Sequence, residues 1–141
     1  MTRHESREQA FAVVFERQFT DQTFDEIIEA ATESRDFVCS GFCRRLLNGV
    51  EAHAEEIDTA IEANCRGWNL RRLSKVALAV LRLAVYELLF ENDIPDGVSV
   101  NEAVELAKEY GSKEDASYVN GVLSGILRSR KNPETPVESE A

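Results

Sequence analysis

The sequence has no apolar stretch long enough to span a membrane. Its longest apolar run, VALAVLRLAVYELLF at 76–90, is 15 residues long, whereas a transmembrane helix needs about 20. Arg82 and Glu87 also interrupt this run. The opening MTRHESREQ lacks the apolar segment of a secretory signal peptide. We therefore expect no membrane partner and a cytoplasmic location, with 76–90 as the central buried helix of a domain.

Cysteine and histidine are scarce, with three and two residues respectively. An odd number of cysteines without a secretory leader favours a reducing cytosol over a disulfide framework. Cys39 and Cys43 are one helical turn apart with no histidine beside them, so we interpret them as small core side chains. Neither His4 nor His53 has a nucleophile or a set of metal ligands nearby in sequence. Phosphate-binding and dinucleotide-binding glycine motifs are also missing, and we expect no enzyme activity, metal or cofactor.

Positive charge is in deficit, with 16 basic against 26 acidic residues and a net charge of −10. A chain of this charge repels nucleic acid as a whole. Any polyanion partner must therefore meet a local basic patch or be held by a second protein.

The residues that are present predict an all-α fold in a single domain. Forty-three per cent of the 141 residues are hydrophobic, which is enough for one core. Capping residues and apolar periodicity predict helices at about 5–19, 24–31, 36–66, 74–90, 99–111 and 113–127. The third is expected as one long helix, and the fifth is expected to begin with a capping box of Ser99 and Glu102. The segment NDIPDGVS before it reads as a loop.

The stretch YVNGVLSGIL at 118–127 allows two interpretations. Asn-Gly between apolar residues is a strong β-hairpin signal, yet the apolar residues around it recur at helical spacing. We favour the helix. Glycine inside a helix costs about 1 kcal/mol relative to alanine, so Gly121, Gly125 and the similarly placed Gly49 suggest close helix crossings.

Two groups of basic residues are candidates for binding. Arg3, His4 and Arg7 lie together near the start of the first helix, where they are able to hold two or three phosphates. The alternative is a solvated face neutralised by Glu5 and Glu8. A second basic group flanks Trp68 and is either a docking surface or a solvated turn; it consists of Arg66, Arg71, Arg72 and Lys75.

Three segments resemble the NusB family of transcription antitermination proteins, in that family's order and spacing. They are SREQAFAVVFERQF at 6–19, FCRRLLNGVEAHAEEIDTAI at 42–61, and VLRLAVYELLFENDIPDGVSVNEAVELAKEYGSKEDASYVNGVLSGIL at 80–127. The resemblance implies about six to seven helices in two small bundles. It also implies a non-catalytic role: binding boxA-type single-stranded RNA together with the ribosomal protein NusE, and joining the RNA polymerase antitermination complex that transcribes ribosomal RNA.

The resemblance assigns roles to individual residues. Arg3 and Arg7 correspond to the family's arginine-rich RNA-binding start, and Tyr118 corresponds to an aromatic residue of the same RNA-binding surface. Phe15 and Ala77 correspond to the surface that docks NusE. We place Arg71 and Arg72 with that docking surface and His4 with the RNA contacts.

This sequence departs from the family pattern at its first helix. His4, Glu5 and Ser6 stand where relatives carry a denser basic cluster, which implies low intrinsic RNA affinity. A helical adaptor with little RNA binding of its own is therefore the alternative function. We expect a helical domain over 1–130, a disordered acidic tail over 131–141, and either a monomer or a homodimer.

Overall fold

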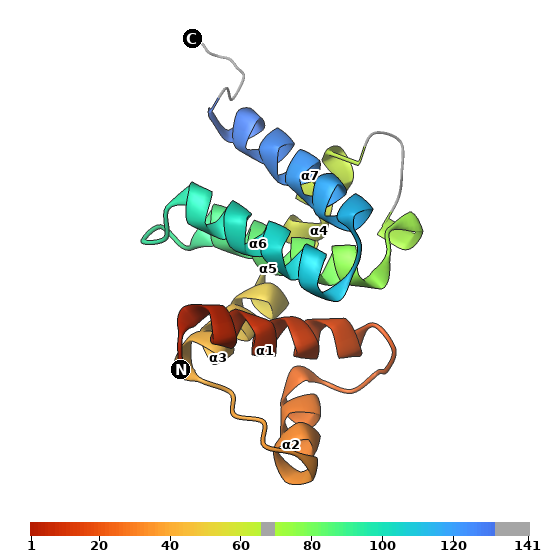
Figure 1. Cartoon of the computed structure of the whole chain (residues 1–141), viewed down its shortest axis with the longest axis vertical. Helices are drawn as coiled ribbons and strands as arrows, with labels where there is room; N and C mark the ends of the chain where they lie inside the picture. The colour runs from red at the N-terminus through yellow and green to blue at the C-terminus, as the bar shows by residue number, and fades with distance from the viewer. Residues whose placement is uncertain (66–69, 132–141) are drawn as a thin grey trace.

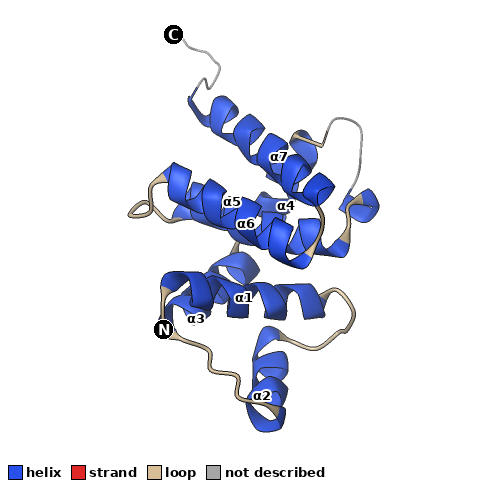
Figure 2. Ribbon diagram, viewed as in Figure 1, coloured by secondary structure: helices blue, strands red, loops and turns tan. Residues whose placement is uncertain are grey.

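The computed structural model describes residues 1–65 and 70–131. Within these ranges it contains α-helices, one short 3-10 helix and no strand, as Figure 2 shows, which confirms the all-α prediction. None of the described helices is both long and apolar enough to cross a membrane. The predicted acidic tail lies outside the described residues from 132 onward. In chain order the elements are α1 (Arg3–Arg17), α2 (Phe24–Ser34), α3 (Gly41–Ala52), α4 (Ala54–Ala63), η1 (Leu70–Arg72), α5 (Lys75–Phe90), α6 (Asp96–Tyr110) and α7 (Lys113–Lys131).

Helix α5 is the centre of the fold. Eleven of its 16 residues are buried, and it packs against α1, α3, α4, α6 and α7. A helix that is apolar on all sides must be covered on all sides. In Figure 1, α1, α2 and α3 form one group beneath α5, while α4 and α6 overlap α5 in the view and α7 lies above them as the second group. The two predicted bundles therefore meet at α5.

Local capping explains where several helices begin. Thr2 and Thr23 each accept a hydrogen bond from the backbone N–H of the glutamate three residues later, and the carboxylate of that glutamate accepts one from the backbone N–H of the threonine. Ser74 accepts a bond from the backbone N–H of Ala77 at the start of α5. These bonds satisfy N–H groups that have no partner inside the helix.

The predicted long third helix was wrong, because the chain bends at His53. Backbone bonds run from His53 N–H to the Gly49 carbonyl and from Ile57 N–H to the His53 carbonyl, so the helical pattern continues on both sides of the bend. The His53 ring stacks on Phe90 of α5, with ring centroids 3.8 Å apart. This tertiary contact accompanies the change of direction that sends α3 to one bundle and α4 to the other.

The predicted start of α6 was also wrong. The helix begins at Asp96 with Pro95 at the capping position, an arrangement compatible with the fixed φ of proline. Ser99 is buried and donates its hydroxyl hydrogen bond to Glu87 of α5 instead of capping a helix. The Ser99 hydroxyl that we predicted to accept a capping bond from a local backbone N–H instead donates to a carboxylate of another helix.

The Asn-Gly pair at 120–121 is helical, as predicted, but its glycine has a different environment from the other two. A Cβ on Gly49 would come within 2.1 Å of the Tyr86 ring, and a Cβ on Gly125 would come within 2.4 Å of the Asn64 side chain. A Cβ on Gly121 would meet nothing within 4 Å. The close approach of a side chain from another helix or turn therefore explains the glycines at 49 and 125. The close helix crossing predicted at Gly121 was wrong.

Candidate functional site

Arg3 lies exposed in the first turn of α1, immediately after the cap at Thr2. Its guanidinium lies over the ring of Phe42 in α3, 4.4 Å from the ring centroid. The negative face of an aromatic ring attracts a cation without neutralising it. Arg3 is therefore a positioned surface cation at the start of the chain.

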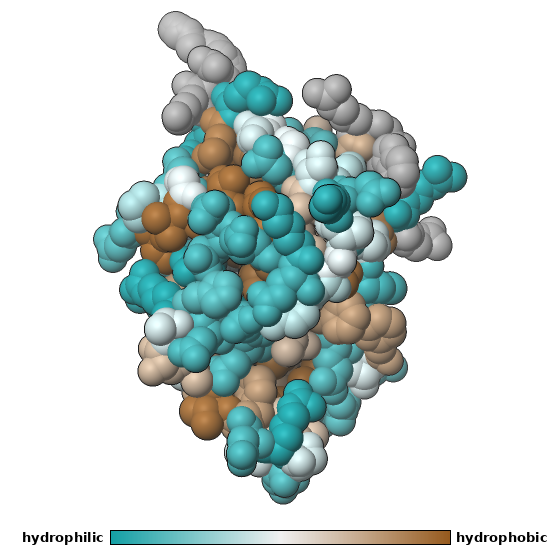
Figure 3. All heavy atoms as spheres, viewed as in Figure 1, coloured by the Kyte–Doolittle hydropathy of each residue, from teal (hydrophilic) through white to brown (hydrophobic). Residues whose placement is uncertain are grey.

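His4 lies between α1 and α6 among acidic side chains. Its Nδ1 is 2.8 Å from Oε1 of Glu102, and its Nε2 is 3.8 Å from Oε2 of Glu8. The hydrogen bond with Glu102, followed by the charges of the surrounding carboxylates, raises the pKa of His4 above its ordinary value. His4 thus has a strongly acidic environment, and Figure 3 shows a largely hydrophilic surface over α6.

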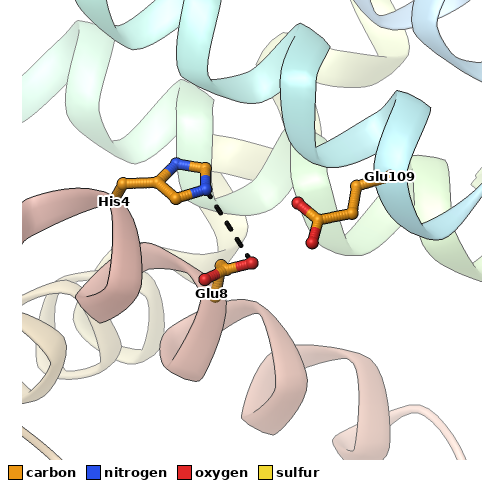
Figure 4. A group of neighbouring side chains, drawn as sticks. All are labelled: His4, Glu8 and Glu109. Carbon is orange, nitrogen blue, oxygen red and sulfur yellow. Dashed lines mark ion pairs between the residues drawn. The ribbon is translucent and has the colours of Figure 1, made fainter.

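Two glutamates lie beside His4. Figure 4 shows Glu8, one turn further along α1, and Glu109 of α6 with their carboxylates directed toward the same space as the imidazole. One ligand atom from each of the three side chains lies within 4.8 Å of the other two. Burial and the hydrogen bond shared with Glu8 raise the pKa of Glu109. We refer to His4, Glu8 and Glu109 as the His4 cluster; sequence spacing missed it because α6 is about 100 positions from α1.

Arg7 lies inside the protein and is not part of the exposed surface. Its side chain is 4% exposed, and its Nε and a terminal nitrogen donate to the two carboxylate oxygens of Glu87 at 2.9 and 2.8 Å. Ser99 donates a third bond to the same carboxylate at 2.8 Å. The predicted direct RNA contact by Arg7 thus faces a physical obstacle, since its guanidinium is already bound to a buried partner.

Tyr118 lies in α7, whereas Arg3 and His4 lie at the start of α1. It lines a hollow of about 530 Å³ with Asn64, Cys65 and Arg128. Burial raises the pKa of its phenol. Figure 1 shows α6 between α7, the helix that carries Tyr118, and α1, the helix that carries Arg3 and His4. An RNA that touches both has to extend across the α6 layer.

An aromatic groove runs along the other end of α1. Phe15 lines it and is joined by Phe19, which is 61% exposed, and by Tyr110, which is 44% exposed. The groove has a volume of about 410 Å³, and Phe11, Ala12, Glu16 and Val76 complete its lining. Exposed aromatic side chains of this kind are typical of protein interfaces.

The other residues predicted to dock NusE are Ala77, Arg71 and Arg72, of which Ala77 and Arg72 differ in their exposure. Ala77 is 2% exposed and lies in the core, so its methyl group adds no area to the docking surface. The exposed neighbour is Lys75, whose Nζ lies 5.8 Å from the centroid of the Phe19 ring. Arg72 is exposed. The Arg71 side chain, together with Arg66 and Trp68, lies outside the described residues.

A buried carboxylate that we had not predicted joins α3 and α5. Glu91 accepts hydrogen bonds from Arg45, whose Nε lies 2.8 Å away, and from the Tyr86 hydroxyl at 2.7 Å. These bonds, chiefly those from Arg45, lower the pKa of Glu91. Tyr86 is also the ring that lies against Gly49, so this cluster fixes the α3–α5 contact.

Comparison with known proteins decides the family. The family model of NusB matches residues 4–128. This chain belongs to the NusB family. The NusB antitermination protein of Clostridium novyi (strain NT) is 39% identical over 133 residues, a match that covers 92% of this chain and all of that relative.

Solved NusB structures have the same fold. NusB of T. maritima superposes with a TM-score of 0.81 at 38% identity, covering 91% of this chain and 92% of that one. The antitermination factor NusB in a crystal structure with NusE and double-stranded RNA superposes with a TM-score of 0.80 at 28% identity. That match covers 92% of this chain and 99% of the other. The predicted NusB-like fold is confirmed.

Proposed function

We propose that this protein is a transcription antitermination factor that binds boxA-type RNA together with NusE and joins the RNA polymerase antitermination complex on ribosomal RNA genes. The observation that carries the proposal is the near-complete superposition on NusB in a complex with NusE and RNA. Membership of a transcription factor family also supports a non-catalytic role.

We assign the two partners to opposite ends of α1. The aromatic groove around Phe15 and Phe19 is suited to NusE, because it offers exposed apolar area without a high charge. Arg3, with His4 beside it, is suited to RNA phosphates. Tyr118 lines the hollow on α7, and a base of a longer RNA stacked on its ring would contribute about 1 to 3 kcal/mol. Arg7 supports this surface from within through Glu87 and does not contact phosphate.

Charge makes RNA binding depend on NusE. The chain carries a net charge of −10, and acidic side chains surround His4. Few cations therefore remain to release counterions from RNA, and NusE has to add contacts. We expect NusE to raise the affinity for boxA RNA about tenfold or more, which corresponds to a coupling of about 1.4 kcal/mol.

The test is a titration of labelled boxA RNA, with and without NusE, at several salt concentrations. Arg3→Ala is expected to weaken the ternary complex and reduce the salt slope by about one. Arg17→Ala is the matched control, because Arg17 lies at the other end of α1 and also stacks on a phenylalanine, with 5.1 Å between its guanidinium and the Phe24 ring. Equal RNA affinities with and without NusE would contradict the coupling. NusE binding without any RNA contribution from this chain would favour the adaptor function.

A further inference from the structure

The His4 cluster combines the side chains that transition-metal ions bind. His4 and Glu8 are one helical turn apart on α1, and α6 brings Glu109 to the same place (Figure 4). Their ligand atoms lie within 4.8 Å of one another. Ligand atoms around a tetrahedral ion with bonds of about 2.1 Å are separated by about 3.4 Å. The ligand atoms here are therefore at most about 1.4 Å further apart than in a bound tetrahedral site.

Neighbouring side chains hold two of the cluster's groups in orientations suited to an ion. Glu102 lies 2.8 Å from Nδ1 of His4. A proton on Nδ1 directed at this carboxylate leaves the lone pair of Nε2 directed toward Glu8. Carboxylate–histidine pairs of this kind orient metal-bound imidazoles. The Tyr110 hydroxyl donates to Oε2 of Glu8 at 2.9 Å and restrains that carboxylate too.

The local charge also favours a cation. Glu8, Glu102 and Glu109 surround a single imidazole, and the nearest guanidinium nitrogen of Arg7 is 3.8 Å from Glu102. Among residues 1–65 and 70–131 this is the one group of three such side chains whose ligand atoms converge. The histidine favours Zn²⁺ or a similar ion over Mg²⁺ and Ca²⁺, which prefer oxygen ligands.

We propose that His4, Glu8 and Glu109 bind a divalent transition-metal ion of the Zn²⁺ class, with the fourth coordination position open to water or to an RNA phosphate oxygen. Three protein ligands and one open position are characteristic of zinc sites that exchange a ligand. The ion adds two positive charges among the carboxylates of the cluster. The two positive charges offset two of the three carboxylates around His4, which are Glu8, Glu102 and Glu109, and the open coordination position offers a direct bond to a phosphate oxygen.

The direct test is isothermal titration of the full-length, tag-free protein with Zn²⁺. We expect one ion per chain, and a loss of at least tenfold in affinity for both His4→Gln and Glu109→Gln. His53→Gln is the matched control, because His53 also lies beside a glutamate, with Nδ1 3.1 Å from Oε1 of Glu56, but belongs to no group of three converging ligands among the described residues. Thermal melts in chelator establish that each variant is folded.

Cysteine is the competing ligand that the experiment must separate. The Sγ atoms of Cys39 and Cys43 lie 3.1 Å apart, so the absorption spectrum of bound Co²⁺ is recorded as well. We expect ligand-field bands without a thiolate charge-transfer band. Thiolate absorption, absence of binding, or unchanged affinity in both His4→Gln and Glu109→Gln would each overturn the site.

The expected effect of Zn²⁺ on RNA affinity rests on the proposed function, and it is measured separately from metal binding. Zn²⁺ is expected to raise the RNA affinity of the NusE complex several-fold for the unmodified chain, and not for Glu109→Gln. An equal response in both proteins would overturn the role of the ion in RNA binding. The titration of boxA RNA in chelator tests the proposed function separately.

Discussion

The Arg7–Glu87 pair allows a test that separates a structural role from RNA contact. Each side chain is at most 4% exposed, and two hydrogen bonds join them. We consider Glu87→Leu, Arg7→Met and the double variant, all three of which keep an approximately similar side-chain volume. Glu87→Leu leaves a buried guanidinium without its carboxylate and removes the acceptor of the Ser99 hydroxyl.

The expected magnitudes follow from the cost of an unpaired buried charge. Removing one partner of a buried ion pair destabilises a protein by about 3 to 5 kcal/mol, whereas replacing both partners with apolar groups is often neutral. We therefore expect each single variant to lose about 3 kcal/mol or more, and the double variant to lose much less than the sum. At about 4 °C per kcal/mol for a chain of this size, the single variants melt roughly 12 to 20 °C lower.

Urea unfolding followed by far-ultraviolet circular dichroism measures this cycle. Losses that add to within about 0.5 kcal/mol would show that the pair is not coupled and would refute the reasoning. The double variant then reports on RNA, because it remains folded without Arg7. We expect its RNA affinity in the NusE complex to stay within about twofold of the original. A tenfold loss would instead make Arg7 a direct RNA contact, as the resemblance to the family implied.

Three further variants test predictions about stability. Gly49→Ala is expected to destabilise the protein by about 1 to 3 kcal/mol, because its Cβ overlaps the Tyr86 ring. Gly121→Ala has open space and is expected to stabilise α7 by up to about 1 kcal/mol; urea unfolding measures both changes. Glu91→Gln is expected to lower stability at pH 7 by about 1 kcal/mol. Because folding lowers the pKa of Glu91, this contribution is present above the ordinary glutamate pKa and is lost as pH falls through the lowered value. Urea unfolding between pH 7 and acid is expected to show the two proteins converging.

Each of these stability predictions has a result that would contradict it. Equal effects of alanine at Gly49 and Gly121 would mean that the contact with Tyr86 is easily relieved. A stability difference between Glu91→Gln and the original protein that stays constant, or grows, on acidification would show that the ionised carboxylate is not the stabilising form.

The sequence by itself determined most of the helical architecture. The capping boxes at Thr2 and Thr23, the cap at Ser74 and the apolar run of α5 involve residues within one or two turns of each other. Helical hydrogen bonds and caps are local interactions, so local patterns are sufficient to predict them. The order and spacing of the three quoted segments were sufficient to identify the family.

The tertiary structure decided which side chains are available at the surface. Arg7 and Glu87 are 80 positions apart, and Ser99 joins them from a third helix. The burial of Ala77, the bend at His53 and the convergence of Glu109 on His4 likewise depend on helices that are distant in sequence. Whether a side chain is buried or ion-paired depends on which helix packs against it across the core. Apolar periodicity within one helix does not predict which helix that is. The three basic side chains at the start of the chain therefore have different environments: Arg3 is an exposed cation, His4 is an imidazole among three carboxylates, and Arg7 belongs to a buried ion pair.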